Sequence, residues 1–174
     1  MHIIATPTLT LEPQMVAHAE EMFVVLCDQA IYEYENEPPP SLEWLRARFT
    51  KLEARESADG QQQWLNWVIR LPTSELIGFV QATVRPNGNA GIAYVLASAY
   101  WGRGLARDAV KAMMTELVEH YRVRTFSAVL KRENFRSVKL LVHSGFSLAS
   151  VAEHVEYHVA LDELLMLRRQ SPTS

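Results

Sequence analysis

The chain has a single cysteine, no long apolar run and no excess of positive charge. One cysteine cannot form an internal disulfide framework and suits a reducing cytoplasm. No apolar stretch approaches the roughly 20 residues of a membrane-spanning helix, so we expect no membrane partner. The first residues lack a basic segment followed by an apolar one, so we expect no signal peptide. A net charge of -3 also argues against nucleic acid, because binding along phosphates needs a basic surface.

Motifs for common nucleotide cofactors are missing as well. A nucleoside-triphosphate loop needs a longer glycine spacing that ends in Lys-Ser or Lys-Thr. Gly102 and Gly104 are only two residues apart, and no such ending follows them. A dinucleotide fingerprint needs a third small residue, and Arg107 stands in that place. It also needs an acid roughly 20 residues later, where residues 122–125 read Arg-Val-Arg-Thr.

The 174 residues, 48% of them hydrophobic, suffice for one domain with a real core. We expect a single domain over 8–169 and a loose C-terminal tail over 170–174. Patterns of period two and an Asn-Gly hairpin signal predict strands, and three- and four-residue steps predict helices. The expected strands are 8–12, 63–70, 76–85, 91–97, 124–130 and 146–152, and 157–168 contains a seventh that includes 162–168. The expected helices are 15–27, 42–56, 105–121 and the segment between Asn134 and Gly145. Gly78 inside its strand predicts either a bulge or close packing.

The stretch 91–107 reads as a strand, a loop with two glycines and the first turn of a helix. Gly102 and Gly104 let the backbone turn sharply and approach a ligand. The first N–H groups of a helix have no internal partner and lie at the positive end of its dipole. Together with Arg103 and Arg107, this arrangement predicts an anion site of the kind that phosphate occupies.

A second motif follows the expected strand at 124–130. It reads Asn134, two residues, Ser137, an amphipathic helix and then Gly145-Phe146. Asn134 is a good N-cap and Gly145 a good helix stop, with Val138, Leu141 and Val142 expected to face inward.

The two motifs together resemble the GNAT acetyltransferase superfamily. The run Tyr-Trp-Gly-Arg-Gly-Leu-Ala at 100–106 is similar to its acyl-CoA pyrophosphate loop, and Asn-x-x-Ser with Gly-Phe to the motif after its fifth strand. The loop looks most like that of the branch that acetylates ribosomal-protein N-termini. The resemblance covers roughly residues 8–169 and implies an α/β (α+β) fold, a mixed, mostly antiparallel sheet of about seven strands with helices on both faces. It implies acetyl-CoA as co-substrate and no metal.

The resemblance also implies site residues. The cofactor would contact Val95, Leu96, Ala97, Gly102, Arg103, Gly104, Leu105, Ala106, Arg107 and Asn134. Backbone groups near Val95 and Ala97 would become free where the two parallel strands diverge, and would bind the thioester oxygen. Asn134 would bond the pantetheine arm besides capping its helix. Ser137 would contact the cofactor, protonate the leaving sulfur, or only pack.

Proton carriers are harder to name. Tyr94 occupies the strand on which many relatives carry a glutamate, and Leu141 stands where many carry a tyrosine acid. His143, His154 and His158 are candidates for proton transfer, against a more ordinary role as surface or packed histidines. We expect Cys27 to be a buried, inert thiol, because no activating base is adjacent.

The segment 31–40 carries Tyr32, Tyr34, three glutamates and three consecutive prolines. It is either a solvated connection or the lining of a pocket for a cationic amine, with Tyr32 and Tyr34 binding substrate through cation–π contact.

Two functions stay open on the sequence. The first is direct transfer of an acetyl group, in a ternary complex, to a primary amine on a peptide N-terminus or a small molecule. The second is an acyl-CoA-binding sensor or interaction module without turnover, since the expected acid and base are missing. Nothing in the sequence decides between a monomer and a homodimer.

Overall fold

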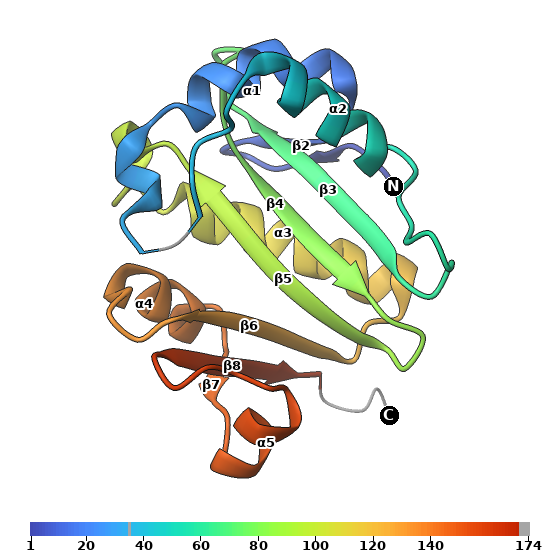
Figure 1. The fold of residues 1–174 in the computed structure, drawn as a ribbon, viewed down its shortest axis with the longest axis vertical. Helices are drawn as coiled ribbons and strands as arrows, with labels where there is room; N and C mark the ends of the chain where they lie inside the picture. The colour runs from blue at the N-terminus through green and yellow to red at the C-terminus, as the bar shows by residue number, and fades with distance from the viewer. Residues whose placement is uncertain (35, 171–174) are drawn as a thin grey trace.

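The computed structural model describes residues 1–34 and 36–170. An eight-stranded sheet of order β1-β2-β3-β4-β5-β6-β8-β7 runs through the molecule (Figure 1). Its strands are Ile4–Ala5 (β1), Thr10–Pro13 (β2), Gln63–Arg70 (β3), Leu76–Val84 (β4), Asn89–Leu96 (β5), Thr125–Lys131 (β6), Ser147–Leu148 (β7) and Glu163–Arg169 (β8). All neighbours pair antiparallel except β5 and β6, which confirms the expected fold class with one more strand than predicted.

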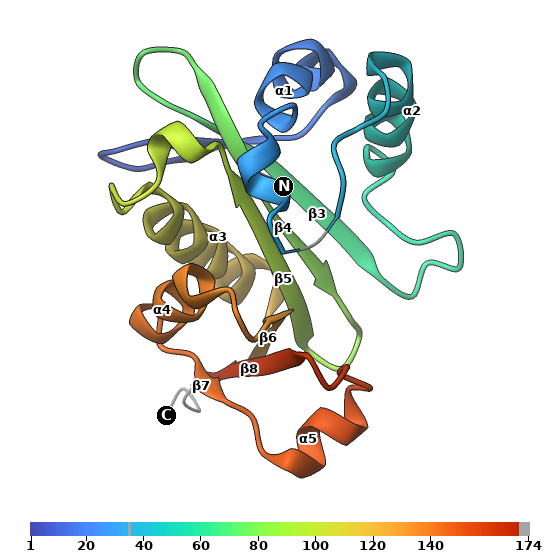
Figure 2. The ribbon, with the colours of Figure 1, turned by 60° about the vertical axis from the view of Figure 1, so that its left-hand side comes forward.

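Helices cover both faces of the sheet. The α-helices are Ala19–Leu26 (α1), Leu42–Leu52 (α2), Leu105–Tyr121 (α3), Phe135–His143 (α4) and Val151–Glu156 (α5). Short 3-10 turns are Val16–His18 (η1), Gln29–Tyr32 (η2) and Ser98–Tyr100 (η3). Figure 2 shows α1 and α2 on one side of β3, β4 and β5, and α3 with α4 on the other. None of the described helices is long and apolar enough to cross a membrane.

Apolar side chains of the central strands point alternately to the two faces of the sheet, so each helical layer packs on its own hydrophobic core. On the α3 side the fully buried side chains include Trp67, Ile69, Met113, Leu117 and Phe126. On the α1 and α2 side a smaller cluster contains Met22, Leu45, Phe49 and Val68. Because successive strand residues point to opposite faces, one strand serves both layers.

The parallel pair β5 and β6 is joined only at its start. Residues 89–91 of β5 pair with residues 125–127 of β6, and the two strands then diverge toward their C-terminal ends (Figure 1). Each keeps its outer neighbour, since β5 pairs with β4 as far as Leu96 and β6 pairs with β8 as far as Lys131. The divergence leaves an opening inside the sheet.

The C-terminal third departs most from expectation. The strand predicted over 146–152 is reduced to β7, because Ser150 starts helix α5 with a capping box. The Ser150 hydroxyl accepts the N–H of Glu153, whose carboxylate in turn accepts the Ser150 N–H. The seventh expected strand, placed within 157–168 and including 162–168, is confirmed as β8 over Glu163–Arg169.

Other predictions need smaller corrections. Cys27 is exposed at the end of α1, not buried. Val142 is 54% exposed and does not face inward, whereas Leu141 does. The predicted tail falls outside the described residues except for Gln170, whose N–H donates to the Arg124 carbonyl at 2.8 Å.

Gly78 on β4 both packs closely and adjoins a bulge. The register between β3 and β4 shifts between Ile69 and Arg70, and Ile69 is the partner of Gly78. A Cβ at Gly78 would lie 2.0 Å from the Val95 carbonyl oxygen on β5. Only glycine lets the two backbones approach this closely.

We therefore expect Gly78→Ala to force β4 and β5 apart, destabilising the protein by about 2–3 kcal/mol and lowering Tm by roughly 4–12 °C in thermal unfolding. Gly91→Ala is the matched control, because its Cβ would meet the Ser127 hydroxyl at an ordinary 3.7 Å. Equal Tm values for the two variants would contradict the close-approach argument.

Candidate active site

The two-glycine loop leads directly into α3. Gly102 and Gly104 have φ of 75° and 79°, in the left-handed region that favours glycine. Gly104 is the N-cap, and the helix begins at Leu105. Within the described part of the chain, no acceptor takes the backbone N–H groups of residues 102–107. These donors and the positive end of a 17-residue helix form an anion site.

Three arginines lie around this loop. Arg103 stacks over the Tyr100 ring with 5.3 Å from guanidinium carbon to ring centroid. Arg107 follows Gly104 by one turn of helix, with its guanidinium 3.9 Å from Asp108. Arg136 of α4 stacks on the ring of Trp101, 3.5 Å from guanidinium carbon to centroid. The sequence did not single out Arg136, because α4 and the loop meet only in the tertiary structure.

Peptide groups along β5 alternate in direction. The Asn89 carbonyl accepts from the Arg85 N–H at 2.9 Å, and the Ala97 N–H donates to the Ile77 carbonyl at 2.8 Å. At both ends of β5 the backbone N–H and C=O groups of the odd-numbered residues therefore point toward β4. The backbone N–H and C=O groups of the even-numbered residues point the other way, and those of 94 and 96 face the opening beside β6.

This alternation corrects one prediction. The backbone of Ala97 is bonded to β4 and is not free, and Val95 belongs to the same odd-numbered set. The N–H groups that face the opening are those of Tyr94 and Leu96. The Leu96 carbonyl is already occupied, because it accepts the Trp101 indole N–H at 2.8 Å. Trp101 thereby ties the glycine loop to the end of β5.

A cavity of about 440 Å³ extends from the opening to the face covered by α1 and α2. Of the predicted site residues, it is lined by Tyr32, Tyr34, Tyr94, Val95, Leu96, Ala106, Asn134 and Ser137. The remaining predicted residues, Ala97, Gly102, Arg103, Gly104, Leu105 and Arg107, are not among its lining. The structure thus brings together groups from both motifs and from the segment 31–40.

Tyr94 lies between the opening and α4. Its hydroxyl donates to the Ser137 carbonyl at 3.4 Å, and burial raises the pKa of Tyr94 to about 12. Asn134 caps α4 as predicted, its side-chain oxygen accepting the Ser137 N–H at 3.1 Å. That bond leaves the Asn134 side-chain NH₂ group for a ligand.

The cavity floor carries three amide side chains that sequence reasoning missed. Asn66 and Gln81 are cross-strand partners, and Gln14 adjoins Asn66 through its N–H, which donates to the Asn66 carbonyl at 2.9 Å. All three line the cavity. Gln14 is only 5% exposed, and its side-chain nitrogen has no hydrogen-bond partner among the described residues. Polar residues on otherwise apolar strands were the available signal.

The segment around Tyr32 is held in place by hydrogen bonds. The Tyr32 hydroxyl donates to the Leu26 carbonyl at 2.7 Å, and burial raises the pKa of Tyr32 to about 12. Asp28 accepts the Ser98 N–H at 2.7 Å, and this bond holds the pKa of Asp28 below its usual range. The bond joins η2 to η3, and so the acceptor segment to the end of β5.

The other reactive side chains lie away from the cavity. Cys27, His143, His154 and His158 are not among its lining residues. His154 is structural, since its Nε2 accepts the Leu165 N–H at 3.0 Å. A larger hollow of about 1020 Å³ lies at the opposite end of the sheet, beside Gly88, and contains neither motif.

The family model described as "Acetyltransferase (GNAT) domain" matches residues 8–147. The chain belongs to this GNAT acetyltransferase family. Acetyl-CoA is therefore its co-substrate, and the protein is an acetyl-CoA-dependent acyltransferase. The free N–H groups of the glycine loop fit the pyrophosphate of coenzyme A. No curated protein sequence matches the chain significantly.

Solved structures support the GNAT fold. The ribosomal-protein-S5-alanine acetyltransferase of Vibrio fischeri has a TM-score of 0.81 at 16% identity, covering 100% of both chains. The Salmonella typhimurium acetyltransferase that modifies the N-terminal serine of ribosomal protein L7/L12 has a TM-score of 0.77 at 20% identity, covering 98% of this chain and 100% of that one. The aminoglycoside acetyltransferase AAC(6')-Ib, solved with coenzyme A, has a TM-score of 0.75 at 19% identity, covering 93% of this chain and 95% of that one.

We expect Gly104→Ala to raise KM for acetyl-CoA about tenfold, because a side chain in the left-handed region costs roughly 1–2 kcal/mol and reorients the loop amides. Steady-state kinetics against acetyl-CoA measure this effect. Gly60→Ala is the control, since Gly60 has a similar φ of 68° and nothing near its Cβ. The same KM in both variants would show that the loop conformation does not matter.

Proposed function

We propose that residues 8–169 form one N-acetyltransferase domain that transfers acetyl directly from acetyl-CoA to a primary amine in a ternary complex. The observation that supports this most is that Trp101 and Ala106, on either side of the glycine loop, line the same cavity as the opening beside β5 and the face under α1 and α2. A cofactor held at the loop would present its acyl group where the cavity receives an acceptor.

The chain's own groups would position and polarise the acyl group. The amides of 102–107, with Arg103 and Arg107, hold the pyrophosphate, and the Asn134 side chain holds the pantetheine arm. The N–H groups of Tyr94 and Leu96 face the opening and donate to the thioester oxygen as negative charge develops there. Holding the amine against the acyl carbon supplies much of the remaining acceleration.

Tyr94 serves better as a hydrogen-bond donor than as the acid. A thiolate with an ordinary pKa of about 8.5 would take a proton from a phenol of pKa about 12 only uphill, by roughly 5 kcal/mol. A thiolate also leaves without strong acid assistance. We therefore infer that Tyr94, like Ser137 beside it, positions the pantetheine end and that the departing thiolate is protonated by solvent.

We infer that the acceptor enters along the amide row formed by Gln14, Asn66 and Gln81. Its amides suit the carbonyl and N–H groups of a peptide, so a peptide N-terminus is the first candidate. The structurally similar enzymes that modify ribosomal-protein N-termini support it. A small amine is the second candidate, supported by the aminoglycoside enzyme and by Glu37, the carboxylate of the described cavity lining. A cytoplasmic setting suits a chain with one cysteine.

One observation favours the alternative, a sensor module that binds acyl-CoA without turnover. Leu141 is buried where many GNAT enzymes carry a tyrosine acid, so this proton carrier is missing. The catalytic proposal answers it with solvent protonation of the thiolate.

The test is a screen of acceptors read out by release of free thiol from acetyl-CoA. Peptides with N-terminal serine or alanine, polyamines and aminoglycosides make up the panel, with N-acetylated peptides as blanks. Turnover on any free amine supports the enzyme, whereas acetyl-CoA binding without turnover on the whole panel supports the sensor.

Direct transfer is tested by mass spectrometry of the protein after incubation with acetyl-CoA and no acceptor. The protein should be unmodified, and a stable acetyl group on Cys27 would contradict direct transfer.

We expect Gln14→Leu to stabilise the free protein by about 1 kcal/mol and to raise KM for the acceptor, because it removes a buried amide nitrogen that has no partner among the described residues and that the acceptor would use. KM for acetyl-CoA should not change. Thermal unfolding and two-substrate kinetics measure the two effects. Gln61→Leu, on the exposed loop before β3, is the control, and an unchanged acceptor KM in Gln14→Leu would remove Gln14 from the acceptor site.

A further inference from the structure

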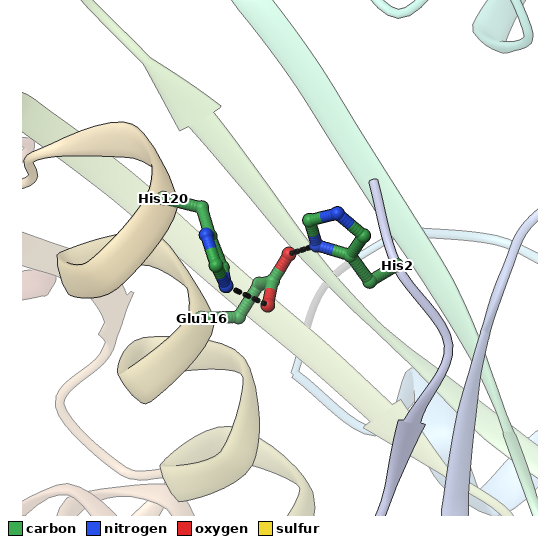
Figure 3. A group of neighbouring side chains, drawn as sticks. All are labelled: His2, Glu116 and His120. Atoms are coloured by element: carbon green, nitrogen blue, oxygen red, sulfur yellow. Dashed lines mark hydrogen bonds and ion pairs between the residues drawn. The ribbon is translucent and has the colours of Figure 1, made fainter.

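Helix α3 carries a second cluster of polar groups near its C-terminal end. Glu116 points between two imidazoles, His120 of the same helix and His2 from the segment before β1 (Figure 3). His2 Nδ1 lies 2.7 Å from one Glu116 oxygen, and His120 Nε2 lies 3.5 Å from the other. One ligand atom from each residue can be chosen so that all three lie within 4.8 Å of one another.

The fold holds these donors in place from two directions. Glu116 and His120 are four residues apart, so they share one face of α3. The carbonyl of His2 accepts the indole N–H of Trp67 at 3.0 Å, which fixes the segment against β3. Ile4 pairs with Leu11 directly afterwards. The three donors therefore need no rearrangement of the backbone to converge.

The donor set suits a particular class of ligand. Two imidazole nitrogens and a carboxylate oxygen match ions of the zinc type, whose bonds of about 2.0–2.2 Å in a tetrahedron separate donor atoms by about 3.3–3.6 Å. The separation of 3.5 Å between His120 Nε2 and Glu116 lies within this range, whereas the 2.7 Å between His2 Nδ1 and Glu116 is shorter and would have to lengthen. Glu116 is 7% exposed while both histidines are open to solvent. An ion would thus have a buried anionic ligand and an accessible fourth position.

We propose that His2, Glu116 and His120 bind one divalent transition-metal ion of the zinc class. The ion would join the segment before β1 to α3 and stabilise the edge of the sheet. It would not take part in acetyl transfer, because Glu116 lies twelve residues after Gly104, about 18 Å along the helix axis at 1.5 Å per residue. No sequence spacing indicates the site, since His2 and Glu116 are 114 residues apart.

The competing arrangement is an ion pair in which a protonated histidine neutralises Glu116. Tyr121 and Arg55 also lie near this cluster. Burial mainly raises the pKa of Tyr121, the charge of Glu116 raises it further, and the charge of Arg55 lowers it. The two arrangements differ in metal dependence. Metal binding uses the unprotonated nitrogens of both imidazoles, whereas the ion pair needs a proton on one of them, so only the first arrangement is stabilised by added zinc.

The test uses the full chain without an affinity tag, freed of metal by chelation. Zinc chloride is titrated at pH 8 by calorimetry, and thermal unfolding is recorded with and without it. We expect one zinc per chain and a rise in Tm of about 5–10 °C at a hundredfold excess over Kd. The variants Glu116→Gln and His120→Ala should each weaken zinc binding at least tenfold, while His143→Ala, on an exposed histidine of α4, should leave it unchanged.

Three results would overturn the proposal. The first is wild-type protein whose Tm does not respond to zinc. The second is zinc binding that survives both Glu116→Gln and His120→Ala, which would show that the ion does not use Glu116 or His120. The third is equal loss of binding in His143→Ala. Cobalt(II) absorption of the wild type gives a readout independent of the variants' folding, because a tetrahedral site yields intense visible bands. None of these outcomes affects the acetyltransferase assignment.

Discussion

The structure depends on two neighbouring strands that stop pairing with each other while each stays paired on its other side. β5 remains bonded to β4 and β6 to β8, so neither can close the opening between them. Backbone N–H groups left without a partner are costly in a closed fold. In the proposed reaction these N–H groups would donate to the thioester oxygen, so no side chain would be needed for that purpose.

Several locally unfavourable backbone and side-chain arrangements lie around this opening. Two glycines in the left-handed region shape the loop, Gly78 allows a carbonyl to approach its backbone, and the buried side-chain nitrogen of Gln14 has no partner among residues 1–34 and 36–170. Hydrogen bonds from Trp101 to Leu96 and from Ser98 to Asp28 hold these features in one arrangement. Strained and unsatisfied groups gathered at one place are typical of a site arranged before its ligand arrives.

Helix α3 connects the two polar sites of the molecule. Its first turn faces the glycine loop, its buried residues form the larger core, and its last turns carry Glu116 and His120. Stabilising its far end against the segment before β1 would therefore support the rigidity of the anion site.

The sequence by itself determined the order of the main strands and helices from β2 to α4, the glycine loop and the Asn134 cap. These features depend on neighbours a few residues apart, so their signals are local. It misplaced the strand expected over 146–152, because the capping box at Ser150 overrode an apolar pattern. Only the tertiary structure decided which backbone groups of β5 face the opening, that Arg136 reaches Trp101, and that Gln14, Asn66 and Gln81 form one row. These facts depend on strand register and on packing between distant segments, which the sequence pattern does not encode locally.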